Sequence, residues 1–330
     1  MNRHLVLLSI AQGLFLTNNV TFIAINGLVG LSLAPEAWMA TLPVMGYVVG
    51  GALSTGLVAK SQQRFGRKGS FQLGLLVALL SAALGAFAVL SQSFWLLVTA
   101  TVVAGYYSAN GQLYRFAAAE LCQPDYREKA VSLVMAGGLI GAVIGPNLAI
   151  QTKSILGMPF AGAYVALMVV AVLSMAVMSF ITFPPAPVVK ADDTGGRPLG
   201  EIMRQPVFVV AAMAAALGYG VMNLLMAATP LAMQVCGLSF EDTGWVLEWH
   251  VIGMFAPGFV TGHLIKRFGV LPIMGVGVLL NIACIAVALS GVDLHQFLWS
   301  MFLLGVGWNF LFTGSTTLSM QAYTPQEKNR

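Results

Sequence analysis

Long apolar runs dominate this chain and limit what it can fold into. A helix needs about 20 predominantly apolar residues to cross the hydrocarbon core of a bilayer. Inside lipid, backbone groups must all find hydrogen-bond partners within the protein, which favours helices. We therefore expect an all-α membrane protein with about ten transmembrane helices. The expected spans are roughly residues 5–33, 37–59, 70–90, 94–121, 130–152, 159–183, 206–235, 243–265, 270–290 and 295–322.

The composition supports lipid as the main solvent. Hydrophobic residues make up 58% of the 330 residues and charged residues only 8%, against about 25% charged residues in soluble domains. The net charge of +4 does not indicate a nucleic-acid partner, because the basic residues lie in short loops and form no stripe. The three cysteines are widely separated, so they predict neither a disulfide framework nor a metal site.

The charges in the loops predict the orientation of the chain. Lys and Arg accumulate in the cytoplasmic loops of membrane proteins. With the N-terminus in the cytoplasm, 14 of the 16 basic residues lie inside, Lys153 lies outside and Arg115 lies within a span. The first apolar run has no convincing cleavage site, so we expect it to remain as the first span. We expect a monomeric, multi-pass protein of the inner membrane, surrounded by the lipid bilayer.

Two similar loops predict an internal repeat. Arg64-Phe65-Gly66 follows the second span, and Arg267-Phe268-Gly269 follows the eighth span, 203 residues later. Asn18 in the first span is matched by Asn223 in the seventh span, 205 residues later. Each match joins a span to the sixth span after it, so the repeating unit contains six helices, in the manner of transporters built from repeats.

The repeat divides the chain into two expected domains. Residues 1–183 are expected to form an N-terminal bundle of six helices, and residues 206–330 an incomplete C-terminal bundle of helices 7–10. Residues 184–205 between them contain several Pro, Gly and Asp residues, which is typical of a linker, here on the cytoplasmic side. Compared with two complete units, we expect spans 11 and 12 to be missing.

The loop after the second span resembles a signature of the major facilitator superfamily. Gln63-Arg64-Phe65-Gly66-Arg67-Lys68 is similar to that family's Asp-Arg-x-Gly-Arg-Arg/Lys loop, with Gln63 in place of the usual Asp. The resemblance covers the whole chain and implies two bundles of six helices. In the family this loop pairs charges with neighbouring helix ends, which implies a gating role for Arg64, Gly66 and Arg67. Cytoplasmic topology is the alternative explanation of these charges.

A glycine-rich stretch in the fifth span is similar to a second motif of the superfamily. Gly137, Gly141 and Gly145 recur every four residues, so they predict a smooth helix face for close packing of another helix. Pro146 loosens the helix locally, which neighbouring groups in a membrane accommodate. The resemblance implies a gating role for Gly141, Gly145 and Pro146 and leaves the direction of transport open.

Arg115 in the fourth span is the clearest candidate for contact with a solute. An ionisable residue within a span is costly and faces a cavity or a partner. The alternative is that Arg115 pairs with Glu120 or extends to the cytoplasmic interface. The segment 114–120 resembles the corresponding sequence in a bacterial subgroup of the superfamily that includes riboflavin uptake carriers. The same span adds a stripe of residues suited to hydrogen bonds and ring stacking: Tyr107, Asn110, Gln112 and Tyr114.

Other spans add polar residues near the middle of the membrane. The resemblance implies that spans 1, 4, 7 and 10 line a central cavity. Any single Asn serves equally well as a hydrogen bond between helices, but the set as a whole favours a cavity. The expected lining residues in spans 1, 7 and 10 are Asn18, Asn19, Tyr219, Asn223 and Asn309.

Two residues of the eighth span are candidates for proton coupling. Burial raises the affinity of a carboxylate for protons, and His titrates near neutral pH. Glu248 and His250 therefore form a candidate proton site, and an interfacial pair in external water is the alternative.

These features predict a secondary transporter for a small organic solute, working by alternating access, as a symporter, an antiporter or a facilitator. We expect no enzyme activity and no cofactor, since the sequence has no phosphate-binding Gly-Lys-Ser/Thr loop and no ordered Ser, His and Asp set. Two alternatives remain open. One is a proton-coupled exporter of drugs or metabolites from the same superfamily, and the other is a membrane fragment that does not transport.

Overall fold

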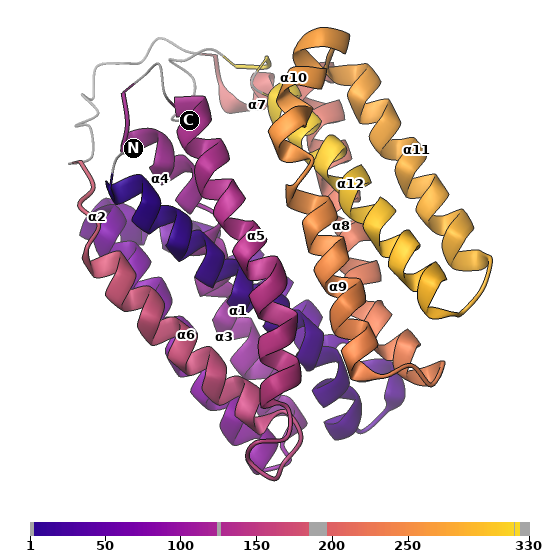
Figure 1. Cartoon of the computed structure of the whole chain (residues 1–330). Helices are drawn as coiled ribbons and strands as arrows, with labels where there is room; N and C mark the ends of the chain where they lie inside the picture. Colours follow the sequence, from indigo (N-terminus) through magenta and orange to yellow (C-terminus); the bar gives the residue numbers. More distant parts are fainter. Residues whose placement is uncertain (1–2, 124–126, 185–196, 320, 324–330) are drawn as a thin grey trace. The chain divides into compact units, whose positions relative to one another are not determined.

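All ten expected spans are helical in a computed structural model of the chain (Figure 1). The structure describes residues 3–123, 127–184, 197–319 and 321–323, so residues 185–196 of the expected linker lie outside the described residues. No strand occurs in the described part. The helices are α1 (Arg3–Leu33), a 3-10 turn (Ala37–Met39), α2 (Leu42–Leu90), α3 (Phe94–Gly111), α4 (Tyr114–Glu120), α5 (Arg127–Thr152), α6 (Ala161–Ser179), α7 (Leu199–Met203), α8 (Pro206–Val235), α9 (Phe240–Phe255), α10 (Gly258–Phe268), α11 (Val270–Leu289) and α12 (Leu294–Ser319).

The helix boundaries differ from the expected spans in three places. α2 joins the second and third spans into one 49-residue helix, bent where Gly66 leaves helical geometry at φ 69° and ψ 179°. The fourth span is broken between α3 and α4, at residues 112–113. The eighth span is broken between α9 and α10, where Pro257 supplies no N–H for the helix ladder. Apolar runs set the spans, and Gly66 and Pro257 mark two of the three departures.

Seven helical segments of the described residues are long and apolar enough to cross a membrane. One of them, residues 37–90, has the length of two spans because of the α2 junction. Many large apolar side chains on these helices are exposed, including Leu53, Leu217 and Leu279, each more than 60% exposed. Exposed apolar surface of this extent is unusual for a soluble monomer, and contact with lipid accounts for it.

The chain contains two compact units. Unit 1 comprises Met1–Ala186 together with Ala227–Glu248, and unit 2 comprises Pro187–Met226 together with Trp249–Arg330. In unit 1, α1 packs against α5, α6, α2 and α3 (Figure 1), and 78% of its most apolar stretch is buried. In unit 2, α11 packs along α12, and α10 contacts both. α1 is therefore the central helix of unit 1.

Glycines allow the closest helix contacts in unit 1. A Cβ atom at Gly105 of α3 would overlap the backbone of Gly50 and Gly51 in α2. On α5, Gly137 lies against the backbone of Ser9 in α1.

The glycine stripe continues along the contact between α5 and α1. A Cβ atom at Gly141 would lie 2.6 Å from the Thr17 nitrogen, and one at Gly145 would lie 3.0 Å from the Val20 Cβ. The predicted smooth face of the fifth span is confirmed, and its partner is the first span. The Thr21 hydroxyl adds a hydrogen bond of 2.8 Å to the Gly145 carbonyl.

The two copies of the repeated loop share their local conformation. Gly66 and Gly269 both have positive φ, at 69° and 91°, with extended ψ of 179° and 159°, a combination that is essentially restricted to glycine. In each copy the Arg guanidinium lies over the ring of the next residue, Phe65 at 5.3 Å and Phe268 at 5.2 Å. This agreement supports the internal repeat.

We predict that Gly105→Ala destabilises the protein by about 1–3 kcal/mol, because the added methyl group overpacks the contact between α3 and α2. The matched control is Gly56→Ala in α2, where nothing lies within 4 Å of an added Cβ atom. Thermal unfolding in detergent measures both variants. Equal melting temperatures for Gly105→Ala and Gly56→Ala would contradict the packing described here.

Candidate functional site

Four aromatic rings form a cluster in unit 2. Trp308 and Phe312 of α12 stack with ring centroids 4.8 Å apart and an interplanar angle of 12°. Tyr219 of α8 lies 6.3 Å from Trp308 and 6.2 Å from Phe312, and Phe255 of α9 lies 6.3 Å from Trp308. Trp308 and Phe312 are four residues apart, so they share one face of their helix. The cluster therefore joins α8, α9 and α12 through ring contacts.

The indole N–H of Trp308 distinguishes this cluster from an ordinary apolar core. Trp308 is 6% exposed, and its Nε1 atom is buried without a hydrogen-bond partner among the described residues. A buried donor left unpaired costs about 1–3 kcal/mol. The cluster consequently combines aromatic rings with one buried donor that has no partner among the described residues.

Two amides predicted to line the cavity form hydrogen bonds with their own unit. The Asn309 side chain donates to the Met254 carbonyl at 2.7 Å and accepts from the Thr261 hydroxyl at 2.6 Å, which ties α12 to α9 and α10. The Asn223 amide donates to the Tyr219 carbonyl one turn earlier, at 2.9 Å. Of the three residues predicted in this unit, Tyr219 is the one in the ring cluster. Solute contact by the two amides stays a prediction.

A second aromatic cluster lies in unit 1. Phe15 of α1 makes edge contacts with Tyr107 of α3 at 5.4 Å and with Tyr114 of α4 at 5.9 Å. Tyr114 also contacts Phe71 of α2, at 4.8 Å. These side chains are at most 2% exposed. The structure thus brings Tyr107 and Tyr114 together around Phe15, which the sequence did not single out. Solute contact by the two tyrosines stays a prediction.

The remaining polar candidates of unit 1 have different surroundings. The buried Asn110 side chain accepts from the Ser70 hydroxyl at 3.0 Å, which joins α3 to α2. The Asn19 amide donates to the Tyr47 hydroxyl at 3.2 Å. Asn18 is 5% exposed, and its side chain makes no hydrogen bond within the described part of the chain. Gln112 caps the end of α3 and is half-buried. Solute contact by these four residues stays a prediction.

Arg115 is half-buried, and its guanidinium lies over the Phe116 ring at 5.0 Å. Glu120, the alternative partner of Arg115, binds Arg67. The Arg67 Nε atom donates to Glu120 at 3.0 Å and Nη2 donates at 2.5 Å. Contact of Arg115 with solute stays a prediction.

The loop around Gly66 ties three helices together. Arg67 of α2 binds Glu120 at the end of α4 and also Gln62 of its own helix. The Lys68 ammonium donates to the Ser179 carbonyl at the end of α6, at 2.5 Å. This arrangement matches the charge pairing with helix ends that the resemblance implied. The gating role itself stays a prediction.

Glu248 and His250 have separate partners. Glu248 accepts a hydrogen bond from the Asn147 side chain of α5. His250 is fully buried, and its Nδ1 atom lies 2.7 Å from the Met301 carbonyl of α12. Because a carbonyl only accepts, Nδ1 carries the proton, and Nε2 has no partner within the described residues. The proton role stays a prediction for both residues.

Sequence reasoning missed Phe255 and Phe312, and placed Trp308 in the cavity-lining span without selecting it. The spacing of four between Trp308 and Phe312 was available as a signal for a shared face. Nothing in the sequence pointed to Phe255, which joins the cluster from another helix.

Comparisons with known proteins agree with this fold. Residues 5–330 match the model of the Major Facilitator Superfamily. The riboflavin transporter RfnT of Brucella anthropi is 37% identical over 333 residues, which cover 99% of this chain and 83% of the relative. The uncharacterised transporter YdeG of Bacillus subtilis is 29% identical and covers 96% of this chain and 77% of the relative.

Solved structures show the same fold at low sequence identity. A bacterial homolog of the human lysosomal transporter Spinster, inward-facing and unoccupied, has a TM-score of 0.72 at 17% identity, with 98% of this chain and 76% of that chain covered. The D-xylose–proton symporter has a TM-score of 0.71 at 15% identity, with 96% of this chain and 85% of that chain covered. The chain belongs to the Major Facilitator Superfamily and is a multi-pass membrane transporter for a small molecule.

Proposed function

We propose that this chain carries a planar aromatic solute of the flavin class across the membrane by alternating access. The ring cluster of Tyr219, Trp308 and Phe312, with its unpaired indole donor, carries this proposal. The relative of 37% identity, a riboflavin transporter, supports the same substrate class.

The chemistry of a flavin fits the cluster. Its flat ring system presents a broad face for stacking on aromatic side chains. Its ring carbonyl oxygens accept hydrogen bonds, so one of them satisfies the Trp308 N–H. Stacking supplies affinity for flat rings in general, and the directed N–H selects those that place an acceptor beside it. The site thus favours a neutral heteroaromatic solute over an aliphatic one.

The solute shifts the equilibrium between outward- and inward-open conformations only as far as it binds one of them better than the other. Arg115, Gln112 and Asn18 are the proposed contacts of unit 1 with the solute. Arg67, Gly66 and Glu120 form the proposed gate at the cytoplasmic end, because their contacts bridge α2 and α4 around a glycine-specific bend. Glu248 and His250 remain the proposed route for a coupling proton.

We predict that Trp308→Ala raises the KM for riboflavin about 10- to 100-fold, because loss of one aromatic stacking partner costs about 1–3 kcal/mol per ring. Uptake of radiolabelled riboflavin into proteoliposomes measures this. Trp308→Phe keeps the stacking and removes the donor, so its KM should lie between those of the wild type and Trp308→Ala.

The matched control for this experiment is Trp299→Ala, which removes an exposed Trp from the same helix. It should leave the KM within about twofold of the wild type, since surface changes are usually within about 0.5 kcal/mol. Equal KM values for Trp308→Ala and Trp299→Ala would remove the ring cluster from solute binding. An absence of riboflavin uptake by the wild type would overturn the proposed substrate.

We predict a small, measurable coupling between Arg67 and Glu120. Their side chains are 25% and 39% exposed, and pairs of this kind contribute about 0.2–1 kcal/mol. Arg67→Ala, Glu120→Ala and the double variant should therefore change the riboflavin uptake rate non-additively. Lys60→Ala, in the exposed part of the same helix, is the control. Additive effects of the two substitutions would show that this ion pair is no gate.

A further inference from the structure

A cavity of about 560 Å³ lies in unit 1, at the end opposite the Gly66 loop. Its walls come from the last turns of α1, α2 and α8, the loop between α5 and α6, and the first turn of α9. By the expected topology this end faces the exterior. The volume falls within the 300–1,000 Å³ that is usual for sites of small ligands. None of the residues proposed above for transport lines it.

Two strained residues line this cavity. Gln92 has φ 53° and Phe160 has φ 65°, and they are the non-glycine residues with positive φ in the described part of the chain. Such conformations cost about 1–3 kcal/mol each and gather at ligand clamps and switch segments. Both lie in the wall of the same cavity. Their shared location marks this cavity as more than a gap between helix ends.

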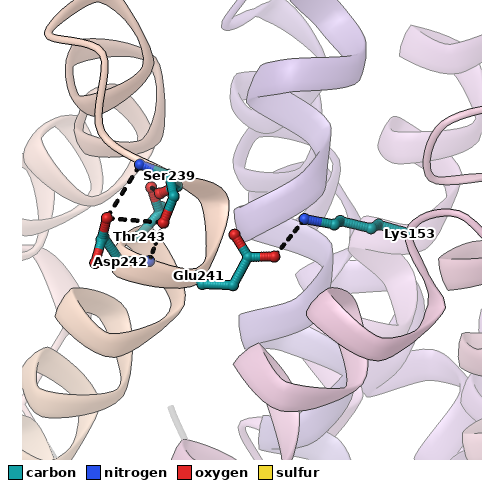
Figure 2. A network of polar contacts seen from close by, with 5 residues as sticks. All are labelled: Lys153, Ser239, Glu241, Asp242 and Thr243. Carbon is teal, nitrogen blue, oxygen red and sulfur yellow. Dashed lines mark hydrogen bonds and ion pairs between the residues drawn. The ribbon is translucent and has the colours of Figure 1, made fainter.

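The outer wall of the cavity is held by an ion pair (Figure 2). The Lys153 ammonium, in the loop after α5, donates to the Glu241 carboxylate at 2.5 Å. This hydrogen bond lowers the pKa of Glu241, so the pair persists until the pH falls through that lowered pKa. Lys153 also lies 5.4 Å from the Phe240 ring. The charge on Lys153 is thereby neutralised within the wall, which leaves no free cation for an anionic ligand.

A capping box fixes the start of α9 and so positions Glu241. The Ser239 hydroxyl donates to the Asp242 carboxylate at 2.7 Å, and the Asp242 backbone N–H donates back to the Ser239 hydroxyl at 3.0 Å (Figure 2). The Asp242 carboxylate also accepts from the Ser239 backbone N–H, at 3.1 Å. This reciprocal pattern defines a helix N-terminus. These hydrogen bonds therefore hold this part of the cavity wall in a defined conformation.

The lining offers both ring contacts and hydrogen-bonding groups. Phe160 and Phe240 meet edge to face at 5.2 Å, and both line the cavity. The Gln92 amide nitrogen is held by the Val89 carbonyl at 2.9 Å, which leaves its carbonyl oxygen as an acceptor. Gln234 adds an exposed side-chain amide from α8.

We propose that this cavity is a second binding site, for a neutral solute that combines an aromatic ring with hydroxyl groups. The ring packs on Phe160 and Phe240, and the hydroxyl groups bond to Gln92 and Gln234. The choice of riboflavin as the probe rests on the proposed function, since riboflavin carries both a flat ring system and a chain of hydroxyl groups.

A solute in this cavity touches both walls that Lys153 and Glu241 join. It therefore binds the conformation with a closed ion pair better than one in which the walls have separated, and it stabilises the closed state. Because a carrier must leave that state in order to reload, high external riboflavin should slow uptake. Substrate inhibition is thus the functional consequence of the second site.

Equilibrium dialysis of the whole purified chain in detergent with radiolabelled riboflavin tests this site. The wild type should bind two molecules of riboflavin per chain. Trp308→Ala should lose the one at the ring cluster and retain the one in the cavity. Met158→Trp fills the cavity from its lining, so it should lose one equivalent and abolish substrate inhibition of uptake. The matched control is Ile155→Trp in the same loop, which is 66% exposed and outside the lining, and it should bind as the wild type does.

A second variant keeps the test valid if Met158→Trp fails to fold. Gln92→Gly removes the side chain and tolerates the positive φ, since glycine adopts that conformation without strain. It should raise the Kd for riboflavin in the cavity at least threefold and leave the Kd at the ring cluster unchanged. If Gln92→Gly binds riboflavin at both sites as tightly as the wild type does, the proposal is overturned.

The outcomes separate the two proposals. One equivalent in the wild type that disappears in Trp308→Ala overturns the second site and leaves the proposed function intact. One equivalent that persists in Trp308→Ala and disappears in Met158→Trp supports the cavity site and overturns the role of the ring cluster. No binding to any form of the protein overturns both proposals.

Discussion

Close backbone contact between α1 and α5 is the interaction on which unit 1 depends. Lipid chains are as apolar as Leu, so helices in a bilayer associate through tight packing and a few hydrogen bonds. Gly137 and Gly141 allow the backbones of α5 and α1 to meet, and Thr21 adds a hydrogen bond to α5. With α1 held in this position, Phe15 reaches Tyr107 and Tyr114. The polar and aromatic residues are placed by backbone packing that glycine makes possible.

Much of the fold follows from patterns within single segments. Run length predicted the spans, because the bilayer thickness sets a minimum of about 20 apolar residues. The spacing of Gly137, Gly141 and Gly145 predicted a packing face, which α1 occupies. The loop signature predicted charge pairing with helix ends, and Arg67 and Glu120 supply it. The breaks within the fourth and eighth spans were not predicted, although Gly111 directly precedes the first break and Pro257 lies at the second.

The candidate sites depend on contacts between distant segments, and those escape a single sequence. Phe255 and Trp308 meet across 53 residues, and an aromatic residue suits a lipid-facing surface as well as a buried one. The same holds for polar residues: Asn309 and Asn110 look like cavity residues in sequence, and each is engaged by hydroxyl groups of a neighbouring helix. The positive φ of Gln92 and Phe160 is a property of the folded chain, and neither residue type predicts it.

Solute counterflow is the measurement that tests most directly whether this chain is an alternating-access carrier for flavins. Proteoliposomes are loaded with unlabelled riboflavin and diluted into a trace of labelled riboflavin, with no ion gradient. A carrier exchanges one for the other, so the label should accumulate transiently above its external concentration and then decline. If the label rises only to its external concentration, as fast as in vesicles loaded with buffer alone, this chain is not an alternating-access carrier for riboflavin.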